Sequence, residues 1–235
     1  MTNIKTRRGG FYWVDNNPYA SVTNIISILD KPALRYWFGK TVYRAFAADP
    51  ALSEKEALAA PWQLSNTSKE RGSTVHSIVE SWKQTKKHIS TIPDQFKGYA
   101  EAFYKFVKTN HVEIQEHEKT VVSKVYNFAG TLDILGKLNT NKKLMIIDVK
   151  TGKGIYQETE LQLSAYRQAL KEEGIDADIS ALLLREDGTY QFAEYKTDRL
   201  DQFLACYSLW RWQNEEKLKQ MSLCRGVKKD AKRSL

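Results

Sequence analysis

The first third of the chain contains three stretches in which apolar side chains recur at helical spacing. They begin at Pro32, run from about Lys69 to Lys86, and run from Asp94 to Thr109. Because residues three and four positions apart share one face of a helix, this pattern predicts three helices, each with an apolar stripe used for packing. The stripes consist of Leu34, Trp37, Phe38, Val42, Ala45 and Phe46, of Val75, Ile78, Val79 and Trp82, and of Phe96, Tyr99, Phe103 and Val107. A short extended segment, FYWVDNNPYASVTNII, precedes them.

The hydrophobic period changes after residue 110. The stretch EKTVVSKVYNFAGTLDILGKLNTNKKLMIIDVK contains three β-branched runs, separated by YNF and by a turn cluster from Asn139 to Lys143. Short β-branched runs bounded by turn residues are typical of antiparallel strands. We therefore expect the second and third runs to fold back on each other.

The remainder of the chain predicts a helix, a hairpin and a last helix. ETELQLSAYRQALKEEG begins near Glu158, with acidic residues in its first turn and Gly174 placed to cap its end. ISALLLREDGTYQFAEYK reads as a β-hairpin with a turn at Asp187-Gly188. A final amphipathic helix is expected from about Asp198 to Gln220.

This order of elements predicts an α/β protein, α+β-like, in which a mixed central β-sheet is flanked by helices. With 235 residues, and without a repeat or a Pro/Gly/Ser-rich linker, the chain is expected to form a single domain. The expected parts are a mainly helical N-terminal part (1–110), a sheet core with its helix (111–197), a C-terminal helix (198–220) and a basic tail (221–235).

The net charge of +8 is concentrated at the two ends of the chain. The first ten residues contain three basic residues and no acid, and residues 217–235 contain seven basic residues and one acid, so residues 11–216 carry a net charge of −1. Solvated tails and phosphate-binding tails both explain this distribution. Charge alone therefore leaves the partner open.

Cysteine content and hydropathy exclude several classes of protein. Cys206 and Cys224 are the two cysteines, without a CxxC pair, so neither a disulfide framework nor a four-cysteine iron-sulfur cluster is expected. No apolar run approaches the roughly 20 residues that span a bilayer. We expect no membrane partner and an intracellular, cytoplasmic protein, in a bacterial or phage-infected host cell rather than in an organelle.

The stretch IIDVKTGK places two charges directly after a buried strand. Asp148 and Lys150 are two residues apart and therefore lie on the same face of that strand. Because an unpaired buried charge is costly, a partner must compensate them. An ion pair on an edge strand is the simplest reading of such a DxK pattern.

A second acid, Asp133 in GTLDIL, is brought near Asp148 by the predicted turn between their strands. Two carboxylates about 4 Å apart repel each other by roughly 4 kcal/mol at an effective dielectric near 20. Protonation relieves this repulsion, and so does a divalent cation such as Mg²⁺, which prefers carboxylates, waters and phosphate as ligands. Lys150, projecting roughly 6 to 7 Å beyond Asp148, suits phosphoryl transfer at such a site.

Other polar residues accompany these three, and each also has a structural reading. Gln162 and Tyr166 share one face of the helix after Lys150, and neither is a typical core residue. His76 lies beside the apolar stripe of the second helix. Glu118 is expected to open the first strand of the sheet.

Taken in order, these stretches resemble a known family. RGSTVHSIVE, Glu118, AGTLD, IIDVKTGK and LQLSAYRQAL, over residues 70–171, are similar to the PD-(D/E)xK nuclease superfamily in its RecB-like branch. PYASVTNIISILDKPALRYW also resembles the "SVT" segment of phage exonucleases and of the mitochondrial genome maintenance exonuclease, which belong to this branch. Two departures are that Asp148 stands where Glu is commoner, and that the chain lacks the cysteines with which several relatives bind an iron-sulfur cluster.

The resemblance implies a restriction-endonuclease-like core and a role for each residue. Asp133, Asp148 and the main-chain carbonyl of Val149 would bind Mg²⁺ or Mn²⁺, with His76 completing the metal shell and Glu118 serving a second metal or a water. Lys150 would be the catalytic lysine, together with Asp133 and Asp148. Gln162 and Tyr166 would orient the DNA strand or the lysine.

The function expected on these grounds is a metal-dependent deoxyribonuclease. The leading hypothesis is an exonuclease acting on single strands or DNA ends in recombination, repair or replication. Two alternatives stay open: a structure-specific endonuclease, and a catalytically silent nucleic-acid-binding module that keeps the fold. The intact set of Asp133, Asp148 and Lys150 favours an enzyme over the silent module.

Overall fold

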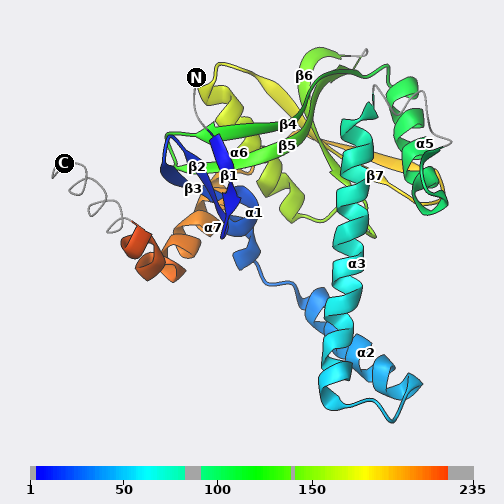
Figure 1. Ribbon diagram of the computed structural model, residues 1–235. Coiled ribbons are helices and arrows are strands. Elements are labelled where there is room, and N and C mark those ends of the chain that lie inside the picture. The colour runs from blue at the N-terminus through cyan, green and yellow to red at the C-terminus, as the bar shows by residue number, and fades with distance from the viewer. Residues whose placement is uncertain (1–3, 83–90, 139–140, 222–235) are drawn as a thin grey trace, which may run out of the picture.

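The computed structural model describes residues 4–82, 91–138 and 141–221 of the chain, which form one mixed sheet with helices around it (Figure 1). The strands are β1 (Ile4–Arg8), β2 (Phe11–Val14), β3 (Asn17–Ser21), β4 (Glu113–Ser123), β5 (Phe128–Leu138), β6 (Asn141–Lys150), β7 (Ala177–Leu184) and β8 (Tyr190–Tyr195). The helices are α1 (Val22–Ile25), the 3₁₀ turn η1 (Ile26–Ile28), α2 (Pro32–Ala48), α3 (Glu54–Glu80), α5 (Asp94–Thr109), α6 (Glu158–Glu172) and α7 (Leu200–Gln213).

The sheet follows the order β1-β2-β3-β5-β6-β7-β8, with β4 also paired to β5. Its pairings are antiparallel except for β3 with β5 and β6 with β7, which are parallel. β4 occupies one edge of β5, whereas β3 and β6 share the other edge. On that shared edge β3 pairs at Phe128 and Ala129, and the pairing with β6 extends from Ile134 to Leu138. On that edge, residues 130–133 of β5 therefore pair with neither β3 nor β6.

Helices cover both faces of the sheet, which confirms the predicted fold class (Figure 1). Leu135 and Ile146 pack into one core with α1, α6 and α7, whereas their neighbours Ile134 and Ile147 pack into a second core with α3 and α5. Successive side chains of a strand point to opposite faces, so a strand buried on both sides is a continuous apolar run. This explains why LDIL and LMII alternate so little in polarity.

Several predicted elements have the predicted bounds. The third helix is α5, the helix at Glu158 is α6, and Gly174 follows α6 with a positive φ of 78°. The hairpin of β7 and β8 is confirmed, with Gly188 at a φ of 76° in its turn. Left-handed φ values at these two positions favour glycine.

Three helix predictions need correction. The second helix begins at Glu54 rather than near Lys69, because Ser53 and Glu56 form a capping box at its start, and its predicted end at Lys86 lies outside the described residues. The last helix is interrupted by a turn at Asn214. The predicted stripe of α2 is not buried, because the body of the protein does not cover this helix.

The extended segment predicted before the helices contains two strands of the sheet. β2 and β3 form a hairpin whose turn residues Asp15 and Asn16 have φ values of 48° and 63°, as a tight hairpin turn requires. Through β3, this hairpin joins the same sheet as β5. Within the described part of the chain, no helix has the length and apolar character needed to cross a membrane.

Candidate active site

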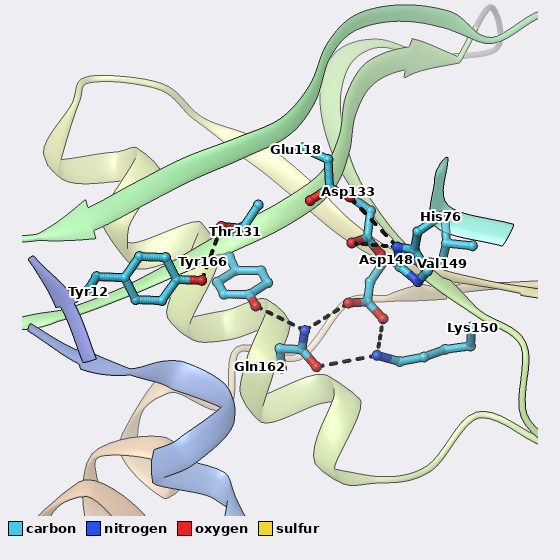
Figure 2. Close-up of polar contacts among 10 residues, drawn as sticks. All are labelled: Tyr12, His76, Glu118, Thr131, Asp133, Asp148, Val149, Lys150, Gln162 and Tyr166. Atoms are coloured by element: carbon cyan, nitrogen blue, oxygen red, sulfur yellow. Dashed lines mark hydrogen bonds and ion pairs between the residues drawn. The ribbon is translucent and has the colours of Figure 1, made fainter. Parts of the chain in front are cut away.

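The site lies where β5 and β6 separate. Their last paired residues are Ile134 and Ile147, so Asp133 and Asp148 are the next residues on each strand. Asp133 takes the place of a backbone partner: its Oδ2 accepts a hydrogen bond of 2.6 Å from the N–H of Val149 (Figure 2). In an extended strand the N–H and C=O of one residue point to the same neighbour. The carbonyl of Val149 therefore faces the gap that contains Asp133.

Three side chains from three elements meet beside this gap. Nδ1 of His76 on α3 lies 3.3 Å from Oδ1 of Asp133 and 3.8 Å from Oε1 of Glu118 on β4. Their possible ligand atoms all lie within 4.8 Å of one another. They line an open pocket of about 620 Å³ together with Gly72, Ser73, Ser77 and Glu80 of α3. One imidazole and two carboxylates are a suitable donor set for a divalent cation.

The sequence predicted Glu118 at the start of a strand, but it lies in the middle of β4. His117 pairs with Ile134 and Lys119 pairs with Leu132, so Glu118 stands opposite Asp133. Its φ of 46° is left-handed, which costs a residue other than glycine on the order of 1 kcal/mol. Such strain at a single polar residue, next to a cluster of ligand atoms, marks Glu118 as a candidate functional residue.

Asp148 belongs to a second group of contacts on the other side of the gap. It is 2% exposed, and its Oδ2 lies 2.6 Å from Nζ of Lys150. Its Oδ1 accepts a hydrogen bond of 2.9 Å from the amide of Gln162, which also donates to the hydroxyl of Tyr166 over 3.0 Å. Oε1 of Gln162 accepts from Lys150 over 3.4 Å (Figure 2). Asp148 and Lys150 thus compensate each other's charge, and Gln162 forms a hydrogen bond with each of them.

The structure brings all the predicted site residues into one region but divides them into two groups. His76, Glu118 and Asp133 form a cluster that can hold a cation, whereas Asp148 is held by Lys150 and Gln162. Val149 lies between the two groups, with its backbone in contact with Asp133. The sequence did not separate these two groups.

The expectation that Gln162 and Tyr166 are poor core residues is wrong. Gln162 is 9% exposed and Tyr166 is 2% exposed, among the apolar side chains under the sheet. Buried polar groups need hydrogen-bond partners, and the amide of Gln162 donates to the hydroxyl of Tyr166. With its hydroxyl bound to Gln162, Tyr166 is placed to orient that amide.

Gly130 is a site residue that the sequence analysis missed. A Cβ at this position would overlap the ring of Tyr166, so any larger residue would displace it. The signal was present in the AGTLD stretch, where the glycine stands three residues before Asp133. Its role depends on the distance between β5 and α6, which the sequence does not show.

The surroundings shift the pKa values of the charged groups. Burial, aided by the charge of Asp133 and opposed by Lys150, raises the pKa of Asp148 to about 6. Burial disfavours the charged form of His76, but the hydrogen bonds and charges of Asp133 and Glu118 outweigh it and raise the pKa of His76 to about 10. Burial likewise opposes the charge of Lys150, and Asp148 overcomes it, so the pKa of Lys150 is raised. Shifts of this size in one cleft are typical of functional sites.

Comparison with known proteins places the chain in a family. A family model described as the PD-(D/E)XK nuclease superfamily matches residues 52–222. The chain belongs to the PD-(D/E)XK nuclease superfamily. It is therefore a nuclease, with DNA as the substrate that the family implies, and nucleases of this superfamily use divalent metal ions.

Individual known proteins add little to this assignment. No curated protein matches the sequence. Among solved structures, 19 chains match. One is an alkaline exonuclease, LHK-Exo, from Laribacter hongkongensis, with 9% identity over 90% of this chain and 94% of that chain and a TM-score of 0.46. Another is the protein SSO0001, with 15% identity over 89% of this chain and 79% of that chain and a TM-score of 0.42.

Proposed function

We propose that this nuclease is a metal-dependent exonuclease that acts on single strands or DNA ends, in recombination, repair or replication. The observation that supports catalysis is that a cluster able to hold a cation lies on one side of the gap between β5 and β6, and Lys150 lies on the other side. The proposal treats the chain as one nuclease domain, because β1 to β3 extend the sheet that carries the site.

The residues that would hold Mg²⁺ or Mn²⁺ are Asp133, His76 and Glu118, with the carbonyl of Val149 facing the same gap and Asp148 alongside. A bound divalent ion would supply Lewis-acid stabilisation of the charge that develops on the phosphate oxygens. Hard oxygen donors with one imidazole fit either ion.

Lys150 is the residue we assign to the scissile phosphate. Its ammonium group is held by Asp148 and Gln162 at the edge of the gap, where it can donate a hydrogen bond to a phosphate oxygen. In the proposed reaction a water attacks phosphorus and gives up a proton to solvent, the bond from phosphorus to the departing sugar oxygen breaks, and that oxygen takes up a proton from solvent. Gln162 fixes the positions of Asp148 and Lys150, and Tyr166 fixes Gln162.

The deciding experiment compares linear and closed circular single-stranded DNA of the same length in the presence of Mg²⁺ or Mn²⁺. An exonuclease degrades the linear strand and leaves the circle intact. Cutting of the circle would instead establish an endonuclease. If neither substrate is degraded with either metal, and duplex DNA and RNA are not degraded either, the chain is a silent binding module and the proposal is wrong.

A further inference from the structure

α2 and the N-terminal half of α3 form an arm that projects from the body of the protein (Figure 1). α2 packs on α3, with the rings of Phe38 and Trp62 5.2 Å apart, and none of its residues is buried. An amphipathic helix usually buries its apolar face. This arm therefore exposes side chains that the body leaves uncovered.

The arm carries most of the exposed large apolar side chains of the described chain. Seven of these eleven residues lie between positions 34 and 64, and the aromatic ones with the greatest exposure are Tyr36 (71%), Tyr43 (73%) and Trp62 (59%). The rest of the arm's set is Leu34, Phe46, Leu58 and Leu64. Concentrated exposure of apolar side chains marks an interaction surface, whereas isolated exposed residues are normal.

Charge indicates what this surface binds. From residue 31 to residue 48 the chain has four basic residues and no acidic one. Lys31 and Arg35 pair with Glu158 and Asp30, whereas Lys40 and Arg44 have no carboxylate partner among the described residues. The partner that fits a cationic and aromatic surface is anionic and offers flat rings.

Aromatic and basic residues alternate along one exposed face of α2. Tyr36, Lys40, Tyr43 and Arg44 are spaced at i, i+4, i+7 and i+8, so their side chains form one stripe. Nζ of Lys40 lies 5.7 Å from the ring centre of Tyr36. Proteins that bind single-stranded nucleic acid combine rings that stack on bases with cations that follow the backbone.

We propose that the α2–α3 arm, through this stripe, binds single-stranded DNA on its way to the active site. The inference rests on the proposed function and names the part of the chain that holds the substrate strand. A single strand fits better than a duplex, because its bases are free to stack on Tyr36 and Tyr43, whereas duplex bases already stack on one another.

One helix connects the arm to the site. α3 carries Trp62 in the arm and His76 in the metal-binding cluster. At about 1.5 Å per residue the path between them is about 21 Å, so a strand must be several nucleotides long to contact both. Strands too short to span this path bind at the site without touching the arm, so affinity should rise once a strand is long enough to contact both.

The first test measures binding without cleavage. Fluorescence anisotropy of labelled oligothymidylates of 4 to 20 nucleotides, in EDTA, gives the affinity as a function of length. We expect the double variant Tyr36→Ala/Tyr43→Ala to bind the longer strands about 10- to 100-fold more weakly and to lose the increase of affinity with length. The matched control, Trp212→Ala/Leu209→Ala, removes two exposed apolar side chains from α7 and should retain both the affinity and its increase with length.

The second test measures the charge contribution. For Lys40→Gln/Arg44→Gln, the slope of log affinity against log salt should decrease by about 1.4, since each phosphate contact on a single strand contributes about 0.7. Lys97→Gln/Lys108→Gln on α5 removes the same charge from another helix and should leave the slope unchanged. Unfolding temperatures close to wild type would show that the variants are folded, as expected for exposed positions.

The outcomes separate the arm from the nuclease activity. Wild-type affinity and length dependence in the tyrosine variant would overturn the inference. A second result would also overturn it: the wild type self-associates in sedimentation, and the tyrosine variant loses this self-association without a change in DNA binding. The arm would then be a contact between two copies of the chain. A wild type that binds single strands through the arm but degrades no DNA would instead overturn the proposed function and leave the arm's role intact.

Discussion

The amide of Gln162 donates a hydrogen bond of 2.9 Å to Oδ1 of Asp148, and this contact joins the helix α6 to the strand β6. The same amide binds the hydroxyl of Tyr166, and the side-chain oxygen accepts from Lys150. Gln162 thus contacts all three polar partners in this part of the site. It holds an acid and a lysine at a fixed separation without touching the pocket that would receive the metal.

Replacing Gln162 with alanine should lower kcat for DNA hydrolysis by about 10- to 100-fold, the usual effect of losing a residue that orients a site. Asp148 and Lys150 would keep their contact but lose the hydrogen bonds that aim them. The measurement is steady-state hydrolysis of labelled single-stranded DNA. Gln168→Ala, on the same helix but bonded to Glu172, is the matched control and should retain activity. Equal rates for both variants would show that Gln162 is only a core residue.

Lys150→Ala should reduce hydrolysis at least 100-fold while DNA binding in EDTA changes little. The variant also leaves Asp148 buried without its cation, so its free energy of unfolding should fall by about 1–3 kcal/mol. Adding Asp148→Asn should recover part of that stability but none of the activity. Lys153→Ala, three residues further along, is the control for both measurements. Full activity of Lys150→Ala would contradict the assigned role.

Gly130→Ala should destabilise the protein by about 1–3 kcal/mol, because the added methyl group overlaps the ring of Tyr166. Since Tyr166 orients Gln162, activity should fall even at temperatures where the variant is fully folded. Chemical denaturation and hydrolysis rates measure the two effects. Gly154→Ala, where an added Cβ meets nothing within 4 Å, should be harmless to packing. A stable and fully active Gly130→Ala would show that α6 moves aside without consequence.

The pKa of Asp148, raised to about 6 chiefly by burial, makes the metal-free protein less stable as pH rises from about 4 to 6. In this window the folded protein binds the proton more tightly than the unfolded chain, so raising the pH favours unfolding. The Asp148→Asn variant carries no titrating group there. Its stability relative to wild type should therefore increase over this range by on the order of 1–3 kcal/mol, measured by denaturation in EDTA. A difference independent of pH would show that Asp148 ionises normally.

The pKa of His76, raised to about 10 by Asp133 and Glu118 against the effect of burial, means that the imidazole is protonated at neutral pH in the metal-free protein. Its contribution to stability is fully present below pH 6.5 and is lost as the pH rises through 10. A metal ligand must be deprotonated, so metal binding at pH 7 should release about one proton. Calorimetry of Mn²⁺ binding in buffers with different ionisation enthalpies measures this release. The His76→Gln variant should bind Mn²⁺ without it, and an equal release from both proteins would place His76 outside the metal shell.

Local pattern was sufficient to predict much of this protein. The β-branched runs around Asp133 and Asp148, the capping glycine after α6 and the turn at Gly188 follow from short-range preferences of backbone and side chain. Asp148 and Lys150 share a face because side chains alternate along any strand. For this reason the order of motifs was enough to recognise the nuclease superfamily.

Tertiary structure decided which groups meet and which stay exposed. The left-handed backbone at Glu118, the fit of Gly130 against Tyr166 and the burial of Gln162 arise from contacts between β4, β5 and α6, and residue type alone does not encode such distances. The predicted apolar stripe of α2 shows the same limit in reverse, because its helical spacing predicted burial, whereas α3 packs against this helix without burying any of its residues. Periodicity determines which side chains share a face, whereas the arrangement of the other elements determines whether that face contacts the core or remains free to bind a partner.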